Sequence, residues 1–81
     1  MVEKYIQTMV SDAIKQEYAE DCFDDALKAL YEMDLQKALI ALKQVRLYSI
    51  SFELSIAAIG MIKAIESKDF TTLKQMMQAI S

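Results

Sequence analysis

The scarcity of turn-forming residues is the feature that most constrains this chain. Its 81 residues include a single glycine, Gly60, and no proline or asparagine. Tight β-turns depend on glycine, proline, asparagine and aspartate, so a fold made of many short strands is disfavoured. Proline is also the residue that interrupts helices most strongly. The sequence therefore predicts an all-α protein with more than about two-thirds of its residues in helices, against the usual third.

The amino-terminal half carries two apolar stripes at helical spacing. The first stripe consists of Val2, Ile6, Met9, Val10, Ala13 and Ile14, and the second of Cys22, Phe23, Ala26, Leu27 and Leu30. The polar stretch 15–21 between them contains no helix breaker. Either one helix spans about residues 2–32, or the helix breaks near Glu20 with Asp21 as the N-cap. We expect one long helix, because nothing in the stretch stops it.

Two later positions have the composition of helix boundaries. The stripe is interrupted at 33–34 and again at 67–69, and each interruption contains an aspartate that can cap the next helix, Asp34 and Asp69. A short last helix is predicted from the apolar residues Phe70, Leu73, Met76, Met77 and Ile80. These boundaries predict a single domain, residues 1–81, folded as a small antiparallel bundle of three to four helices.

One segment is ambiguous. Residues 49–56 alternate strictly between polar and apolar side chains, which is the period of a strand. A lone strand would have no partner for its backbone groups, however. The segment also fits a helical row of Tyr48, Phe52, Ile56 and Ile59. We expect a helix here, and a kink near 49–51 is the further option.

A weak internal repeat has a spacing of 35 residues. Residues 27–30 and 34–35 align with residues 62–65 and 69–70. Repeats of about this length are typical of stacked helical hairpins. Two helix ends built by one rule, an apolar turn followed by an aspartate cap, explain the repeat equally well.

Charge and hydropathy indicate the setting. Residues 1–34 hold nine acids and three lysines, whereas residues 35–81 hold three acids and six basic residues, for a net charge of -3. The amino terminus does not resemble a signal peptide, and the apolar stretch 56–62 is far shorter than the roughly 20 residues of a membrane span. Cys22 is the only cysteine, so it forms no internal disulfide and is interpreted as a small buried apolar residue. We expect a cytoplasmic protein outside the membrane.

The residue types leave little room for catalysis. The chain has no histidine and cannot form a thiolate cluster, so we expect no cofactor and no metal site. The chemical candidates are carboxylates at helical spacing, namely Glu17, Glu20, Asp21 and Asp24, with a second pair at Glu66 and Asp69. They are interpreted as solvated faces, with a magnesium-dependent helical-bundle nucleotide hydrolase as the alternative. Lys37, Lys43 and Arg46 give a weaker alternative, a nucleic-acid accessory protein.

Surplus apolar surface favours a protein-interaction module without catalytic activity, an adaptor, regulator or subunit of a complex. Apolar side chains in residues 35–66 point in nearly every direction around a continuous helix, and a helix that is apolar all round must be covered all round. We therefore expect a homodimer or another protein partner. The alternative is that the helix bends near 49–51, so that its two halves cover each other within one chain. The candidate interface residues are Leu47, Ile50, Leu54, Met61, Met76 and Met77.

Overall fold

The computed structural model describes residues 2–80, with side chains described from Ser11 onward. Four helices follow one another: α1 (Val2–Tyr31), α2 (Leu35–Tyr48), α3 (Phe52–Glu66) and α4 (Phe70–Ile80). They contain 30, 14, 15 and 11 residues, and residues 2–80 contain no strand. The prediction of an all-α fold with more than two-thirds helix is confirmed.

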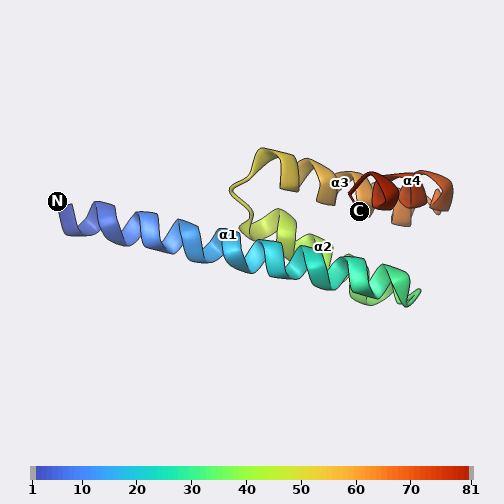
Figure 1. Cartoon of the computed structure of the whole chain (residues 1–81), viewed down its shortest axis with the longest axis horizontal. Coiled ribbons are helices and arrows are strands. Elements are labelled where there is room, and N and C mark those ends of the chain that lie inside the picture. The colour runs from blue at the N-terminus through green and yellow to red at the C-terminus, as the bar shows by residue number, and fades with distance from the viewer. Residues whose placement is uncertain (1, 81) are drawn as a thin grey trace.

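The helices run alternately up and down and pack in chain order (Figure 1). The most extensive contact joins α1 to α2, a smaller one joins α2 to α3, and the smallest joins α3 to α4. The molecule measures 50 × 21 × 19 Å because α1 extends beyond the other helices (Figure 1). The prediction of one long helix through 15–21 is confirmed, since the acidic stretch contains nothing that breaks the backbone hydrogen bonds.

Small side chains allow α1 and α2 to pack closely. On α1, a row at spacings of three and four is buried, and it consists of Ala19, Cys22, Ala26 and Ala29. The facing side of α2 buries Ala38, Leu42 and Val45, each with 0% exposure. Residues without long side chains let two helices approach toward the short end of the usual range of about 8 to 10 Å. The interpretation of Cys22 as a small buried apolar residue is confirmed.

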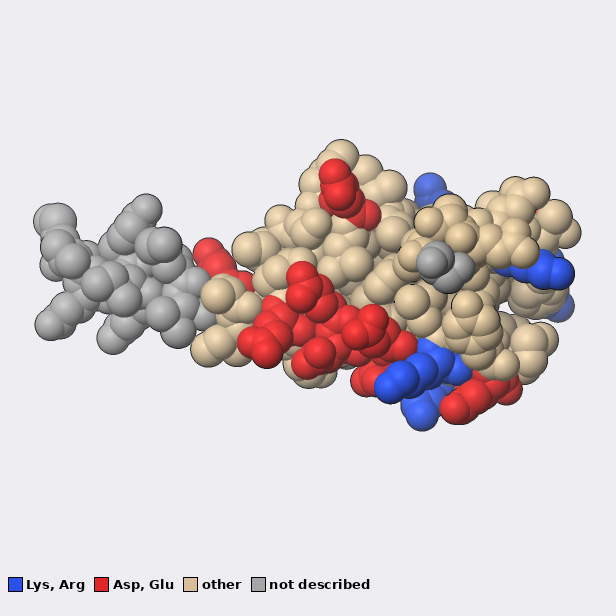
Figure 2. All heavy atoms as spheres, viewed as in Figure 1, with Lys and Arg blue, Asp and Glu red and all other residues tan. Residues whose placement is uncertain are grey.

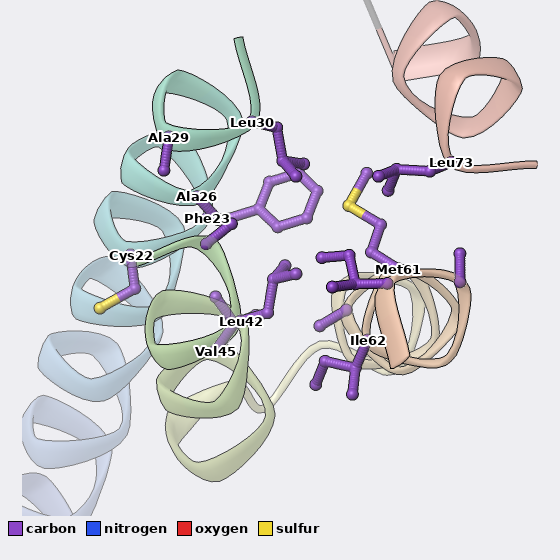
Figure 3. Packing of buried hydrophobic residues seen from close by; sticks show 14 residues of the cluster. Cys22, Phe23, Ala26, Ala29, Leu30, Leu42, Val45, Met61, Ile62 and Leu73 are labelled. Atoms are coloured by element: carbon purple, nitrogen blue, oxygen red, sulfur yellow. The ribbon is translucent and has the colours of Figure 1, made fainter. Parts of the chain in front are cut away.

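Larger side chains fill the space between this hairpin and the second one. Phe23 and Leu30 of α1 point toward Met61 of α3 and Leu73 of α4 (Figure 3). An interface candidate is expected at the surface of the single chain, whereas Met61 is fully buried. Burying a methionine side chain fully at this junction stabilises the fold by about 1.5 to 3 kcal/mol.

The first turn ends α1 with a left-handed residue. The backbone N–H of Asp34 donates to the carbonyl of Ala29 at 2.9 Å, and the N–H of Met33 donates to that of Leu30 at 3.1 Å. Met33 has φ of 61°. This pair of bonds is the Schellman motif, which satisfies the last carbonyls of a helix.

The second turn repeats the first at the spacing seen in the sequence. Asp69 N–H donates to Ala64 at 2.8 Å, Lys68 N–H donates to Ile65 at 3.1 Å, and Lys68 has φ of 58°. The 35-residue repeat is therefore explained by two helix ends built by one rule. It also relates two successive helical hairpins, α1–α2 and α3–α4.

Both aspartates cap the next helix, as predicted. A carboxylate oxygen of Asp34 accepts from the N–H of Lys37 at 3.2 Å. Asp69 accepts from the N–H of Thr72 at 3.2 Å and from its hydroxyl at 2.6 Å. The hydroxyl of Thr72, followed by its backbone N–H, lowers the pKa of Asp69 from its ordinary value, because both bonds favour the ionised form.

The third break corrects the prediction of a helix through 49–56. α2 ends at Tyr48, and α3 begins at Phe52 with Ser51 as its N-cap. The side-chain amide oxygen of Gln16 on α1 accepts three bonds from this connection. The donors are the Ser49 hydroxyl at 3.2 Å, the Ile50 N–H at 2.8 Å and the Ser51 N–H at 3.2 Å. The backbone groups that the helix would have used are satisfied by a side chain from another helix.

This break removes the basis for treating residues 35–66 as one continuous apolar helix. Because the chain reverses at 49–51, α2 and α3 pack against each other. Much of the apolar surface that pointed in every direction along a straight helix is thus covered within one chain. The apolar surface that remains exposed lies in particular places, described below.

Relieving the left-handed conformation at Lys68 should stabilise the fold. A non-glycine residue at positive φ costs about 1 to 2 kcal/mol. Replacing it with glycine recovers only part of this free energy, because glycine loses more conformational entropy on folding. We expect Lys68→Gly to raise the free energy of unfolding by about 0.5 kcal/mol, measured by urea denaturation. Ser67→Gly is the control, since Ser67 has φ of -88° and should gain nothing. Equal changes in the free energy of unfolding for both variants would contradict the assignment of the strain to the left-handed conformation of Lys68.

Asp69 should make the stability of the chain depend on acid pH. Its folded-state pKa is lowered, so its contribution is present above the pKa of the unfolded state and lost as the pH falls through the folded pKa. We expect the melting temperatures of wild type and Asp69→Ala to differ at neutral pH and to converge in acid. Thr72→Val, which removes the hydroxyl donor, should show a weaker pH dependence. A difference that stays constant from pH 7 to pH 3 would rule this out.

Gln16 should hold the connection between α2 and α3. Gln16→Ala removes the acceptor of the Ile50 N–H, while the Ser51 N–H and the Ser49 hydroxyl keep their bonds to Ser49 and Ser51. We expect a loss of about 1 kcal/mol in the free energy of unfolding. Gln36→Ala, at an exposed position of α2, is the matched control. Hydrogen exchange at Ile50 and Ser51 should accelerate in Gln16→Ala and not in the control. Unchanged exchange at both amides would show that the Gln16 bonds do not protect the connection.

Candidate functional site

The carboxylates proposed as a metal site lie on open surface. Glu17, Glu20, Asp21 and Asp24 are all exposed, and so are Glu66 and Asp69. Figure 2 shows acidic side chains gathered in a band along α1. Within the described part of the chain, no three acidic or cysteine side chains converge so that they could hold a metal ion. The arrangement is that of a solvated acidic face and gives no support to the hydrolase alternative.

The basic residues of α2 also point to solvent. Lys37, Lys43 and Arg46 are exposed. Tyr48, the aromatic residue beside them, already packs against another ring. The ring of Tyr48 packs edge-on against that of Tyr18, with centroids 5.2 Å apart and planes at 86°. A base-stacking platform needs a free ring face, and this contact already engages the ring of Tyr48. The nucleic-acid alternative gains no support.

Tyr18 joins α1 to α2 on the outer side of the hairpin. A side-chain hydrogen bond with Cys22 raises the pKa of Tyr18, and the nearby Tyr48 and Asp25 act in the same direction. The phenol is therefore protonated at neutral pH, so its hydroxyl is a neutral polar group at the end of an apolar ring. Nearly half of the Tyr18 surface, 48%, remains exposed.

An open groove lies between the first turn and α4. Its volume is about 340 Å³. The first turn and its flanking helix ends contribute Leu30, Tyr31, Met33 and Leu35, and α4 contributes Phe70, Leu73, Lys74 and Met77. Lys74 is the only charged residue in this lining. The groove exists because α4 packs mainly on α3 and does not close against α1.

Several groove residues expose a large part of their surface. Tyr31 is 69% exposed, Met33 is 75% exposed and Phe70 is 45% exposed, while Leu73 forms the buried floor. Large exposed apolar side chains gathered around a concavity are typical of a binding surface. Met77 is half-buried here, and methionine adapts readily to different partners.

The predicted interface residues fall into separate places. Leu47 and Ile50 are 70% and 62% exposed near the connection between α2 and α3, and Leu54 is partly buried against the core. Met77 lines the groove. Met76 instead lies over Gly60 of α3, where its terminal carbon would be 2.7 Å from an added Cβ. The structure therefore brings only Met77 to the groove.

Three exposed groove residues were missed from the sequence. Tyr31, Met33 and Phe70 each lie beside a helix end, at 31–33 and 70. For Met33 and Phe70 the signal was an apolar residue directly next to an aspartate cap, where a polar residue costs nothing, whereas Tyr31 is three residues before Asp34. Apolar residues in such positions are either staples of the helix end or parts of a surface contact.

Comparisons of the chain with protein-family models, curated proteins and solved structures find no match. Among the described residues, no helix combines the length and the apolar character needed to cross a bilayer.

Proposed function

We propose that this chain is a non-catalytic protein-interaction module that binds an amphipathic helix of a protein partner in the groove between α1 and α4. The observation that carries the proposal is the exposed apolar rim, Tyr31, Met33 and Phe70, around a buried floor. An amphipathic helix inserts side chains at spacings of three and four into such grooves. The lone cysteine, Cys22, is compatible with a reducing cytoplasmic setting for this role.

The position of the groove supports a helix as the bound element. Its two walls are helical, since α1 ends on one side and α4 runs along the other. A helix between them would complete the packing that α1 and α4 do not make with each other, with ridges seated in the grooves of both. Lys74 at the wall offers a pairing site for an acidic residue at the edge of the partner helix.

The test uses exposed residues so that the fold is preserved. Immobilised full-length chain should retain a partner from native extract, and Tyr31→Glu should lose it because a carboxylate at the rim cannot be buried unpaired. Phe52→Glu is the matched control, since Phe52 is 78% exposed and does not line the groove. Quantitative mass spectrometry of the retained proteins is the measurement.

The expected result is a partner retained by wild type and Phe52→Glu and reduced at least about tenfold by Tyr31→Glu, the effect of a modest hot spot. Circular dichroism and melting should show both variants folded. Retention of the same proteins by all three chains would refute the groove as the binding site.

A further inference from the structure

The two turns that share one backbone conformation differ in the side chains they carry. In each turn the residue before the aspartate is left-handed, Met33 with φ of 61° and Lys68 with φ of 58°. The 35-residue spacing also pairs Tyr31, the last residue of α1, with Glu66, the last residue of α3. The turn after α3 therefore has polar residues at the two positions where the turn after α1 has tyrosine and methionine.

The turn itself does not require a methionine at position 33. Glycine is preferred in this conformation, because a residue with a side chain is strained in it. Lys68 shows that a polar side chain fits the same turn. Met33 is 75% exposed and lies outside the buried core, so its side chain gains little from folding. It does line the groove, and contact with a bound partner there accounts for its apolar character.

Met33 is also the most exposed sulfur-containing residue among the side chains that the structure describes. Cys22 and Met61 are buried, and Met61 lies between the two hairpins (Figure 3). Met76 and Met77 of α4 are half-buried. A peroxide in solution must contact a sulfur atom to oxidise it, so Met33 is the first of these residues to react.

We propose that Met33 is a site of reversible oxidation, and that its conversion to methionine sulfoxide weakens binding in the groove. The inference rests on the groove function proposed above and adds the regulation of that site. The oxidant is hydrogen peroxide. Its O–O bond breaks, one oxygen atom forms a bond to the thioether sulfur, and the other oxygen atom leaves as water. The sulfur loses the two electrons that the peroxide gains.

The sulfoxide changes the groove without changing the fold. It replaces a flexible apolar thioether with a polar, chiral group whose oxygen accepts hydrogen bonds. In the free chain this oxygen lies in water, because Met33 is exposed. Under an amphipathic helix it faces the apolar side of the partner and loses its water. A polar group that is buried without a hydrogen-bond partner opposes binding.

The exposure of Met33 also makes the reaction reversible. Two methionine sulfoxide reductases, one for each epimer at sulfur, return the sulfoxide to the thioether. They need access to the side chain, which an exposed residue in a turn provides. The same oxidation at the fully buried Met61 would place a polar group in the core and destabilise the fold. Position 33 thus allows the binding surface to be altered while the core is left intact.

The first measurement needs only the full chain. Peptide mapping by mass spectrometry after brief treatment with hydrogen peroxide gives the oxidation rate of each methionine. We expect Met33 to oxidise at least about tenfold faster than Met61, and the two rates to become equal in urea, where the fold no longer shields Met61. Equal rates in the folded chain, or a slower reaction at Met33, would overturn the proposal.

The second measurement is retention of a partner from native extract after the peroxide has been removed. Wild type oxidised at Met33 should retain at least about tenfold less of the protein whose retention depends on Tyr31. Met33→Leu is the matched control, because leucine is apolar and contains no sulfur, so its retention should resist peroxide. Met33→Gln, which is polar without oxidation, should retain as little as oxidised wild type. Treatment with both reductases should restore retention by oxidised wild type.

The outcomes separate this proposal from the groove function. Equal peroxide sensitivity of wild type and Met33→Leu would assign the effect to another residue and overturn the role of Met33. Full retention by oxidised wild type would overturn it too, as would an oxidised chain that unfolds by circular dichroism and melting. In each of these cases the groove function survives if Tyr31→Glu still loses the partner. A chain that retains no protein through Tyr31 before or after oxidation contradicts the groove function itself, together with the regulation that rests on it.

Discussion

The close contact between α1 and α2 is the constraint on which the rest of the structure depends. Alanines and Cys22 on one helix, facing Ala38 and Val45 on the other, allow the two backbones to approach with little side chain between them. Such a contact gains less apolar burial per residue than a leucine seam, but it excludes water and fixes the register. The larger residues Phe23 and Leu30 are then left free to reach α3 and α4 (Figure 3).

The chain reverses three times without proline or glycine, so side-chain and backbone hydrogen bonds hold the three turns. At the reversals after α1 and after α3, a left-handed residue ends one helix and an aspartate begins the next. At the reversal between α2 and α3, serines and the amide of Gln16 replace the missing breaker. The first kind is local and needs only a few neighbouring residues. The second kind depends on α1 being in place, so the α2–α3 connection follows from the hairpin contact.

This difference explains what could be predicted from the sequence. The aspartates at 34 and 69 indicate helix starts, because a cap side chain bonds a backbone N–H no more than three residues away. The sequence predicts a helix through 49–56 with a kink near 49–51 only as the further option, because the main acceptor at the break, Gln16, is more than 30 residues away and no local pattern contains it. The groove could not be predicted either, since it results from α4 packing on α3 instead of on α1. The burial of Met61 could not be predicted for the same reason, because it depends on Leu73 and Phe23 arriving from other helices.

Packing in chain order has a further consequence for the surface. A closed four-helix bundle covers each helix on two sides, and its ends meet because the last helix packs on the first. Here the contacts weaken from the first pair of helices to the last, and the ring stays open. One opening is the groove beside α4, and Ile40 and Leu47 are left exposed on α2. An 81-residue chain that buries Leu42, Val45 and Met61 completely, yet leaves Ile40 and Leu47 exposed, has a sufficient core without them. Their apolar character is therefore not explained by the stability of the single chain.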